Sequence, residues 1–165
     1  RRQWEFWKVA DMIVLAVPIG LGLGRIGNFI NGELYGRESS LPWAMIFPGG
    51  GSVGRHPSQL YEAFLEGLVL FLFVRWIYSR RFHPGAALWS FIFGYGFVRF
   101  MVEFVRSPDA HIGLDLGPLT RGQVLSLPML LIGTFFLIRV LRKGPLAPPI
   151  GARPSRPRKR PPKQK

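Results

Sequence analysis

Long apolar stretches dominate the pattern of hydrophobic and polar positions along this chain of 165 residues. Four of them approach the roughly 20 residues that an α-helix needs to cross a bilayer. They lie at about residues 12–30, 59–78, 85–105 and 124–140. The pattern predicts an all-α polytopic membrane protein whose transmembrane helical domain, residues 1–144, contains four transmembrane helices. Residues 1–8 are expected to be the end of a loop.

The remaining residues, 145–165, are rich in Pro, Arg and Lys and have no apolar periodicity. This composition predicts a disordered basic tail. Ten of the 22 Lys and Arg residues lie between Arg139 and Lys165, where there is no acidic residue. Because so much of the charge belongs to the tail, it does not indicate a nucleic-acid-binding face, and no nucleic-acid partner is expected. The tail would either attract anionic lipid or remain a solvated extension.

Basic residues are also unevenly distributed over the two sides of the predicted spans. Sixteen Lys and Arg residues flank the spans on one side, and four lie on the other, in the loops at 31–55 and 106–121. Loops rich in Lys and Arg stay in the cytoplasm. Both ends of the chain are therefore expected to be cytoplasmic and these two loops external. The ionisable residues inside the spans then lie near the external boundary.

The first predicted span carries Arg25 and Asn28, three residues apart and so on one helical face. An arginine in the bilayer core costs about 3 kcal/mol or more on insertion scales. Arg25 could extend its head group to the interface, or it could line a polar cavity. A neighbouring asparagine favours the cavity.

The third predicted span carries Tyr95, Arg99, Glu103 and Arg106 at spacings of four, four and three, which places them on one helical face. Arg99 and Glu103 could form only a structural ion pair. Alternatively, Glu103 orients Arg99, while Arg99 and Arg106 present their guanidinium groups to a phosphate. The spacing leaves both interpretations open.

The second predicted span begins with His56 and carries Glu62 and Glu66 four residues apart. The two carboxylates either serve a site or neutralise the arginines across the bundle. His56 is either a hydrogen-bonded residue at the interface or a base. The three histidines have no metal-ligand spacing, and without cysteine the chain has no thiolate nucleophile or disulfide. No metal or cofactor is expected.

Glycines recur in the first predicted span at positions 20, 22, 24 and 27. Three of them match the string of a dinucleotide-binding fingerprint, but no strand precedes them and no βαβ unit follows. The glycines better fit a helix that either packs closely against another backbone or is loosened beside a lipid-filled cavity.

Five longer motifs contain these residues. They are GRIGNFINGELYGR at 24–37, HPSQLYE at 56–62, GYGFVR at 94–99, EFVRSPD at 103–109 and GQVLSLP at 122–128. In this order, over roughly residues 20–140, they resemble the motifs of bacterial prolipoprotein diacylglyceryl transferases.

The resemblance implies a multi-pass enzyme of the bacterial cytoplasmic (inner) membrane, with its site near the external face. It would transfer the diacylglyceryl group of phosphatidylglycerol to the lipobox cysteine in the signal-peptide region of a prolipoprotein, the first step of lipoprotein maturation. The thiolate sulfur displaces a phosphate ester at a saturated carbon and releases glycerol phosphate. This step needs a deprotonated thiol and cations near the departing phosphate.

The resemblance also implies roles for single residues. Arg25, Arg99 and Glu103 are expected to be catalytic, with both arginines at the lipid phosphate. Asn28 would hydrogen-bond the lipid, and Glu33, Glu62 and Glu103 would orient the arginines. The expected phosphatidylglycerol-binding and supporting residues also include Gly36, Tyr95, Arg106 and His56.

Members of the family have seven spans and an upstream histidine that would handle the thiol proton. The four spans here indicate the C-terminal portion of such a bundle, incomplete at its N-terminus, with the general base upstream. Two other functions stay open: a fragment of a transporter and a non-enzymatic protein that binds anionic lipid. A transporter would spread polar residues over the full depth of the bilayer, whereas the fourth span has few.

Overall fold

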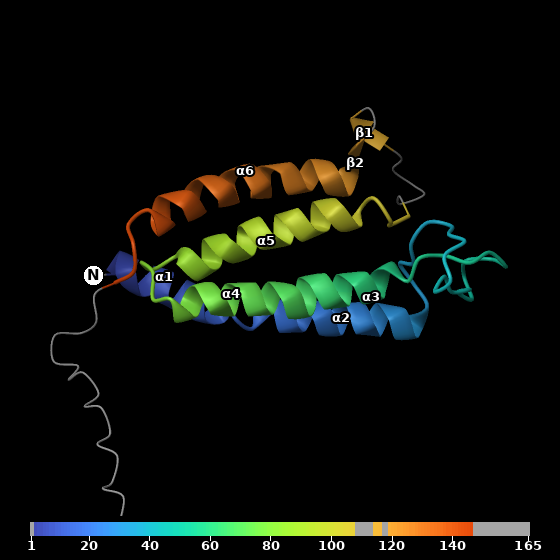
Figure 1. The fold of residues 1–165 in the computed structure, drawn as a ribbon, viewed down its shortest axis with the longest axis horizontal. Coiled ribbons are helices and arrows are strands. Elements are labelled where there is room, and N and C mark those ends of the chain that lie inside the picture. The colour runs from blue at the N-terminus through green and yellow to red at the C-terminus, as the bar shows by residue number, and fades with distance from the viewer. Residues whose placement is uncertain (1, 108–113, 117–118, 147–165) are drawn as a thin grey trace, which may run out of the picture.

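The computed structural model describes residues 2–107, 114–116 and 119–146, which form a bundle of helices lying roughly side by side (Figure 1). The helices are α1 (Arg2–Ile13), α2 (Val17–Asn31), α3 (Ser58–Glu62), the π-helix η1 (Ala63–Val69), α4 (Leu70–Ser79), α5 (Ala86–Val102) and α6 (Arg121–Leu141). A short antiparallel hairpin of β1 (Leu114–Leu116) and β2 (Leu119–Thr120), which the sequence did not predict, precedes α6.

Two helical segments are long and apolar enough to cross a membrane, namely Glu5–Asn31, which joins α1 and α2, and Arg121–Leu141. Helix α5 is apolar but has only 17 residues. The helical run from α3 to α4 is divided by η1. The mostly helical architecture is therefore confirmed, whereas the number of four transmembrane helices stays a prediction.

The expectation of a loop at residues 1–8 is wrong for residues 2–8, which belong to α1. Tertiary contacts hold this segment as a helix. The ring of Trp7 lies 6.0 Å from that of Trp89 on α5. The carboxylate of Asp11 accepts hydrogen bonds from the backbone N–H groups of Gly85 and Leu88, at 2.7 and 2.9 Å. Asp11 thereby caps the first turn of α5 from a different helix.

Close helix contacts are made at glycines. A Cβ atom added to Gly22 on α2 would lie 2.9 Å from the Cα of Gly67 on η1, and one on Gly133 of α6 would lie 2.8 Å from the backbone N of Phe93 on α5. Small residues let helix backbones approach in this way. The packing interpretation is thus confirmed for Gly22, whereas a Cβ atom on Gly20, Gly24 or Gly27 would meet no other part of the described structure within 4 Å.

The outer surface of the bundle is apolar. A small core of Val14, Leu70, Val74 and Ala87 is buried between the helices. Large apolar side chains elsewhere are exposed, including Leu23, Ile30, Leu72, Leu131 and Phe135. An apolar outside of this extent is typical of helices in contact with lipid.

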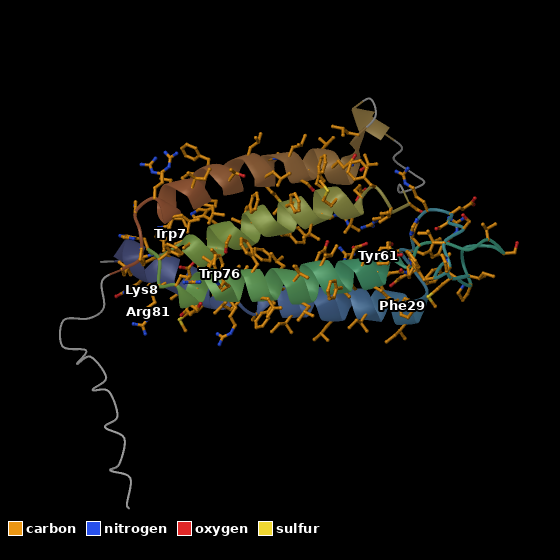
Figure 2. All side chains as sticks on the ribbon, viewed as in Figure 1. Trp7, Lys8, Phe29, Tyr61, Trp76 and Arg81 are labelled. Carbon is orange, nitrogen blue, oxygen red and sulfur yellow. The ribbon has the colours of Figure 1, made fainter. Side chains whose placement is uncertain are left out.

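The two ends of the bundle differ. The end that we call the basic end holds the start of α1, the turn between α4 and α5, and the end of α6; Trp7, Lys8 and Arg81 lie there (Figure 2). Leu146 donates its backbone N–H to Arg81 O at 2.8 Å. The first two residues of the predicted tail therefore adjoin this turn, and residues 147–165 lie outside the described part. The opposite end, the loop end, holds the segment 32–57 and the hairpin.

Candidate functional site

Six charged side chains from three helical segments meet near the loop end of the bundle. They are Arg25 on α2, Glu62 and Glu66 at the α3–η1 junction, and Arg99, Glu103 and Arg106 on or just after α5. We call this set the arginine–glutamate cluster. The ion pairs that cross between helices join residues far apart in the sequence. The fold therefore brings these charges together.

Glu62 lies at the centre of the cluster and is fully buried. Its Oε2 atom is 2.8 Å from Arg25 Nε, 3.6 Å from Arg99 Nη1 and 4.0 Å from Arg106 Nη1. A buried carboxylate is stable only when it is paired with cations. Glu62 therefore neutralises arginines across the bundle, which is one of the two roles left open for it.

Two further carboxylates hold single arginines. Glu66, also fully buried, accepts a hydrogen bond from Arg25 Nε at 3.2 Å. Glu103 Oε2 lies 3.2 Å from Arg99 Nη2, one helical turn away. The expected i, i+4 pair of Arg99 and Glu103 is confirmed. The sequence had singled out Glu62 rather than Glu66 as a site residue, although their spacing already placed both on one face.

The π-helix η1 begins directly after Glu62 and contains Glu66. A π-helical turn is wider than an α-helical one and often occurs at functional sites. Here it lies against α2, where Gly22 and Gly67 allow close contact. The contact brings both carboxylates to Arg25, which follows Gly22 by three residues.

The carboxylates are buried, but the arginines remain partly exposed. The side chains of Arg25 and Arg99 keep 16% and 18% of their surface accessible, while those of Glu62 and Glu66 have none. Arg99 Nη1 is buried and has no hydrogen-bond acceptor among the described residues. The side chains of Arg25 and Arg99 are therefore more accessible to a ligand than the carboxylates of Glu62 and Glu66.

Asn28 lies one helical turn after Arg25, and Tyr95 lies one helical turn before Arg99. Asn28 is partly buried on α2, and its side chain makes no hydrogen bond to another described residue. The ring of Tyr95 stacks on Phe91, with ring centres 5.8 Å apart, and packs against the core. Both positions are compatible with a role beside the cluster.

Gly36 joins the loop after α2 to the end of α5. Its N–H donates to His56 O at 2.8 Å, and a Cβ atom at this position would lie 2.5 Å from Val105 O. The next residue, Arg37, donates its backbone N–H to Val105 O and its Nε to Arg106 O, both at 2.9 Å. Gly36 is thus needed because no side chain fits there, a reason that the motif alone did not show.

His56 lies beside a pair of aromatic side chains. The hydroxyl of Tyr61 accepts the Nε1–H of Trp43 at 2.7 Å and lies 3.4 Å from His56 Nδ1. The direction of the contact between Tyr61 and His56 depends on which ring nitrogen of the histidine carries the proton. Figure 2 shows Tyr61 at the loop end, on α3. The sequence did not identify the contribution of Trp43 or Tyr61.

Glu33 does not belong to the arginine–glutamate cluster. Its side chain is exposed and accepts a hydrogen bond from Asn31 at 3.3 Å. Its carbonyl oxygen accepts one from the buried Gln59 at 2.6 Å. Among the described residues no ion pair joins Glu33 to an arginine. The structure therefore does not give Glu33 the orienting role that was expected.

Within the described ranges, no group of three or more His, Asp or Glu side chains is placed to hold a metal ion. The chemistry that the cluster offers is electrostatic. Guanidinium groups bind phosphate through paired N–H donors, and three arginines meet in this cluster, two of them with partly exposed side chains.

Comparison with known proteins identifies the family of the chain. A family model described as prolipoprotein diacylglyceryl transferase matches residues 1–139, which include every member of the arginine–glutamate cluster. The chain belongs to the prolipoprotein diacylglyceryl transferase family. The membrane setting of the apolar helices follows from this membership.

Individual relatives are named phosphatidylglycerol–prolipoprotein diacylglyceryl transferase. The chain is 56% identical to the protein of Geobacter sulfurreducens over 135 residues, which are 82% of this chain and 52% of the relative. It is 55% identical to that of Shewanella oneidensis over 139 residues, with 84% and 52% covered. For Idiomarina loihiensis the values are 50% over 145 residues, with 88% and 54% covered. The chain thus spans about half the length of the curated relatives that it matches.

Proposed function

We propose that this chain forms the phosphate-binding part of a phosphatidylglycerol–prolipoprotein diacylglyceryl transferase. The observation that supports the proposal is the arginine–glutamate cluster, in which buried carboxylates pair with three arginines, and the side chains of two of these, Arg25 and Arg99, remain partly exposed. The names of the relatives supply the substrates, phosphatidylglycerol and a prolipoprotein.

In this proposal Arg25 and Arg99 bind the phosphate of phosphatidylglycerol from opposite helices. Arg106 adds positive charge, and Asn28 and Tyr95 contact the polar part of the lipid. Glu62, Glu66 and Glu103 fix the guanidinium groups before the lipid arrives. Such preorganisation means that little reorganisation is needed when charge develops during the reaction.

The reaction forms a carbon–sulfur bond and breaks a carbon–oxygen bond. The thiolate of the lipobox cysteine attacks the glycerol carbon that carries the phosphate, and the bonding electrons leave with the phosphate oxygen as glycerol phosphate. Negative charge therefore grows on the oxygen that Arg25 and Arg99 face. We assign this leaving-group side of the reaction to the chain.

We further propose the orientation and the finer architecture. Four transmembrane helices cross the bacterial inner membrane, with the basic end in the cytoplasm, because sixteen Lys and Arg residues flank the spans on that side. The loop end then faces outward, where the signal-peptide region of a prolipoprotein is accessible. Gly36 and His56 support the loop that borders the cluster.

The proposal is tested with the complete protein in phosphatidylglycerol vesicles. Transfer to a prolipoprotein is followed by the gel shift of the lipidated product. We expect Arg25→Ala and Arg99→Ala each to lower the rate by about 100-fold or more, since removing one group that stabilises a developing oxyanion commonly costs this much.

Arg75→Ala is the matched control, because Arg75 is an exposed arginine on α4 that makes no ion pair with another described residue. This variant should retain the normal rate. Normal transfer in both cluster variants would contradict the proposal.

A further inference from the structure

A pocket of about 260 Å³ lies at the basic end of the bundle, far along the helices from the arginine–glutamate cluster. It is bordered by α1, α5, α6 and the turn before α5. Its walls include Trp7, His83, Trp89, Phe136, Arg139 and Lys143. Nothing in the proposed transfer reaction uses these residues.

One wall of the pocket is aromatic. The rings of Trp89 and Phe136 stack with centres 4.4 Å apart, and Trp7 lies 6.0 Å from Trp89. Figure 2 shows Trp7 at this end of the bundle. Aromatic side chains, tryptophan above all, gather where the hydrocarbon of a bilayer meets its polar head groups. The pocket is therefore built like a site at the depth of the head groups.

The other wall is cationic. Arg139 lies in the last turn of α6 and Lys143 follows the end of this helix, and both are exposed. Neither forms an ion pair with a described acidic residue, and the described lining contains no Asp or Glu. Two cations without carboxylates favour an anion in the space between them.

The pocket continues onto a surface that suits acyl chains. Arg139 also borders a neighbouring hollow lined by Phe135, Ile138 and Arg142. Phe135 and Ile138 are exposed apolar residues on the outer face of α6. The pocket itself is slightly smaller than most sites for small molecules, which measure about 300–1,000 Å³. It has room for a phosphate head group, with the chains lying outside along α6.

We propose that this pocket binds an anionic phospholipid, with the phosphate between Arg139 and Lys143 and the upper part of the lipid against the aromatic wall. Basic pockets between helices at the cytoplasmic side of membrane proteins bind such head groups. The site is separate from the one that would hold the substrate lipid. It would fasten the ends of α1, α5 and α6 to the leaflet at the basic end.

The test counts bound lipids on the complete protein by native mass spectrometry in detergent. Phosphatidic acid is the probe, because it is anionic and lacks the glycerol head group of the proposed substrate, and phosphatidylcholine is the neutral comparison. We expect the Arg139→Gln/Lys143→Gln variant to bind phosphatidic acid at this site roughly thirtyfold more weakly, about fivefold for each cation lost. Phosphatidylcholine binding should not change.

The matched control is Arg75→Gln/Arg80→Gln, which removes two charges from exposed positions on and after α4 at the same end but outside the pocket. It should bind phosphatidic acid normally. Equal loss in the two double variants would overturn the proposal in favour of general surface charge. Displacement of the lipid by inorganic phosphate at equal concentration would overturn it in favour of a simple anion site.

Both double variants keep Arg25 and Arg99, so lipid held at the arginine–glutamate cluster contributes equally to each spectrum. The difference between them therefore reports only on the pocket. A failed transfer assay with the cluster variants would leave this comparison unaffected.

Discussion

Glu62 Oε2 lies 2.8 Å from Nε of Arg25, and the glutamate has no accessible surface. The two residues are 37 positions apart and come from α2 and α3. A buried carboxylate in this position determines where the guanidinium group stands, and it also contacts Arg99 and Arg106. The position of Glu62 beside Arg25 therefore determines where the other arginines of the cluster lie.

We expect Glu62→Gln to destabilise the protein and to abolish transfer. The substitution keeps the size of the side chain but leaves three arginines around a neutral amide. Breaking a buried ion pair costs about 3–5 kcal/mol. An unfolding titration with SDS in mixed micelles measures the change in the free energy of unfolding.

Glu38→Gln provides the control, since Glu38 pairs with Arg55 at the surface with 63% of its side chain exposed. Exposed pairs contribute about 1 kcal/mol or less. Similar losses of unfolding free energy in Glu62→Gln and Glu38→Gln would show that burial does not make the ion pairs of Glu62 more stabilising than a surface pair.

We expect Gly22→Ala to force α2 away from η1, because the new Cβ would lie 2.9 Å from the Cα of Gly67. Overpacking of this kind costs about 1–3 kcal/mol. Transfer should fall as well, since the movement separates Arg25 from both carboxylates. Gly24→Ala is the control two residues later, where a Cβ atom would have no described neighbour outside its own helix within 4 Å. That variant should be as stable as the wild type or slightly more stable, and a loss as large as that of Gly22→Ala would refute the packing argument.

We expect Asp11→Ala to lower stability by about 1–2 kcal/mol, the usual cost of removing a helix cap. The substitution removes the acceptors for the N–H groups of Gly85 and Leu88 at the start of α5. Thermal unfolding in detergent measures the effect. Glu5→Ala removes an exposed carboxylate from the same helix and should leave the melting temperature unchanged. An unchanged temperature for Asp11→Ala would mean that α5 does not depend on this cap.

We expect Gly36→Ala to disturb the junction between the loop and α5, because a Cβ there would collide with Val105 O and with His56. The transfer rate should drop with it, since Arg37 and Arg106 are tied to this junction. Gly49→Ala is the comparison, because a Cβ at that position would make only ordinary contacts, the nearest at 3.6 Å from Tyr35. Transfer at the normal rate by Gly36→Ala would contradict the role of the junction.

The sequence predicted the helical bundle and most of the cluster, for physical reasons that can be named. Apolar length indicated the helices, and the i, i+4 spacing placed Arg99 beside Glu103. The count of basic residues predicted that Arg25, Glu62 and Arg99 share one depth, and the contacts between their side chains confirm that they meet.

Other features depend on contacts between distant segments, which periodicity does not contain. The helix at residues 2–8 is held by Trp89 and by the capping of α5 through Asp11. The π-helix that brings Glu66 to Arg25 lies within an apolar segment whose sequence predicts an ordinary α-helix. Glu33 follows Arg25 closely in the motif, yet its side chain is exposed beside Asn31.

In the proposed transferase, the phosphate of the lipid lies between Arg25 and Arg99. The most direct test is the affinity of the complete protein for a phosphatidylglycerol analogue in which a methylene group replaces the oxygen of the bond to be broken. Such a phosphonate binds without reacting, so binding is measured apart from chemistry. We expect Arg99→Ala to bind it at least about tenfold more weakly than Arg75→Ala, because the variant loses one charge-assisted contact of about 1.5 kcal/mol or more. Equal affinity in the two variants would show that Arg99 does not bind the phosphate.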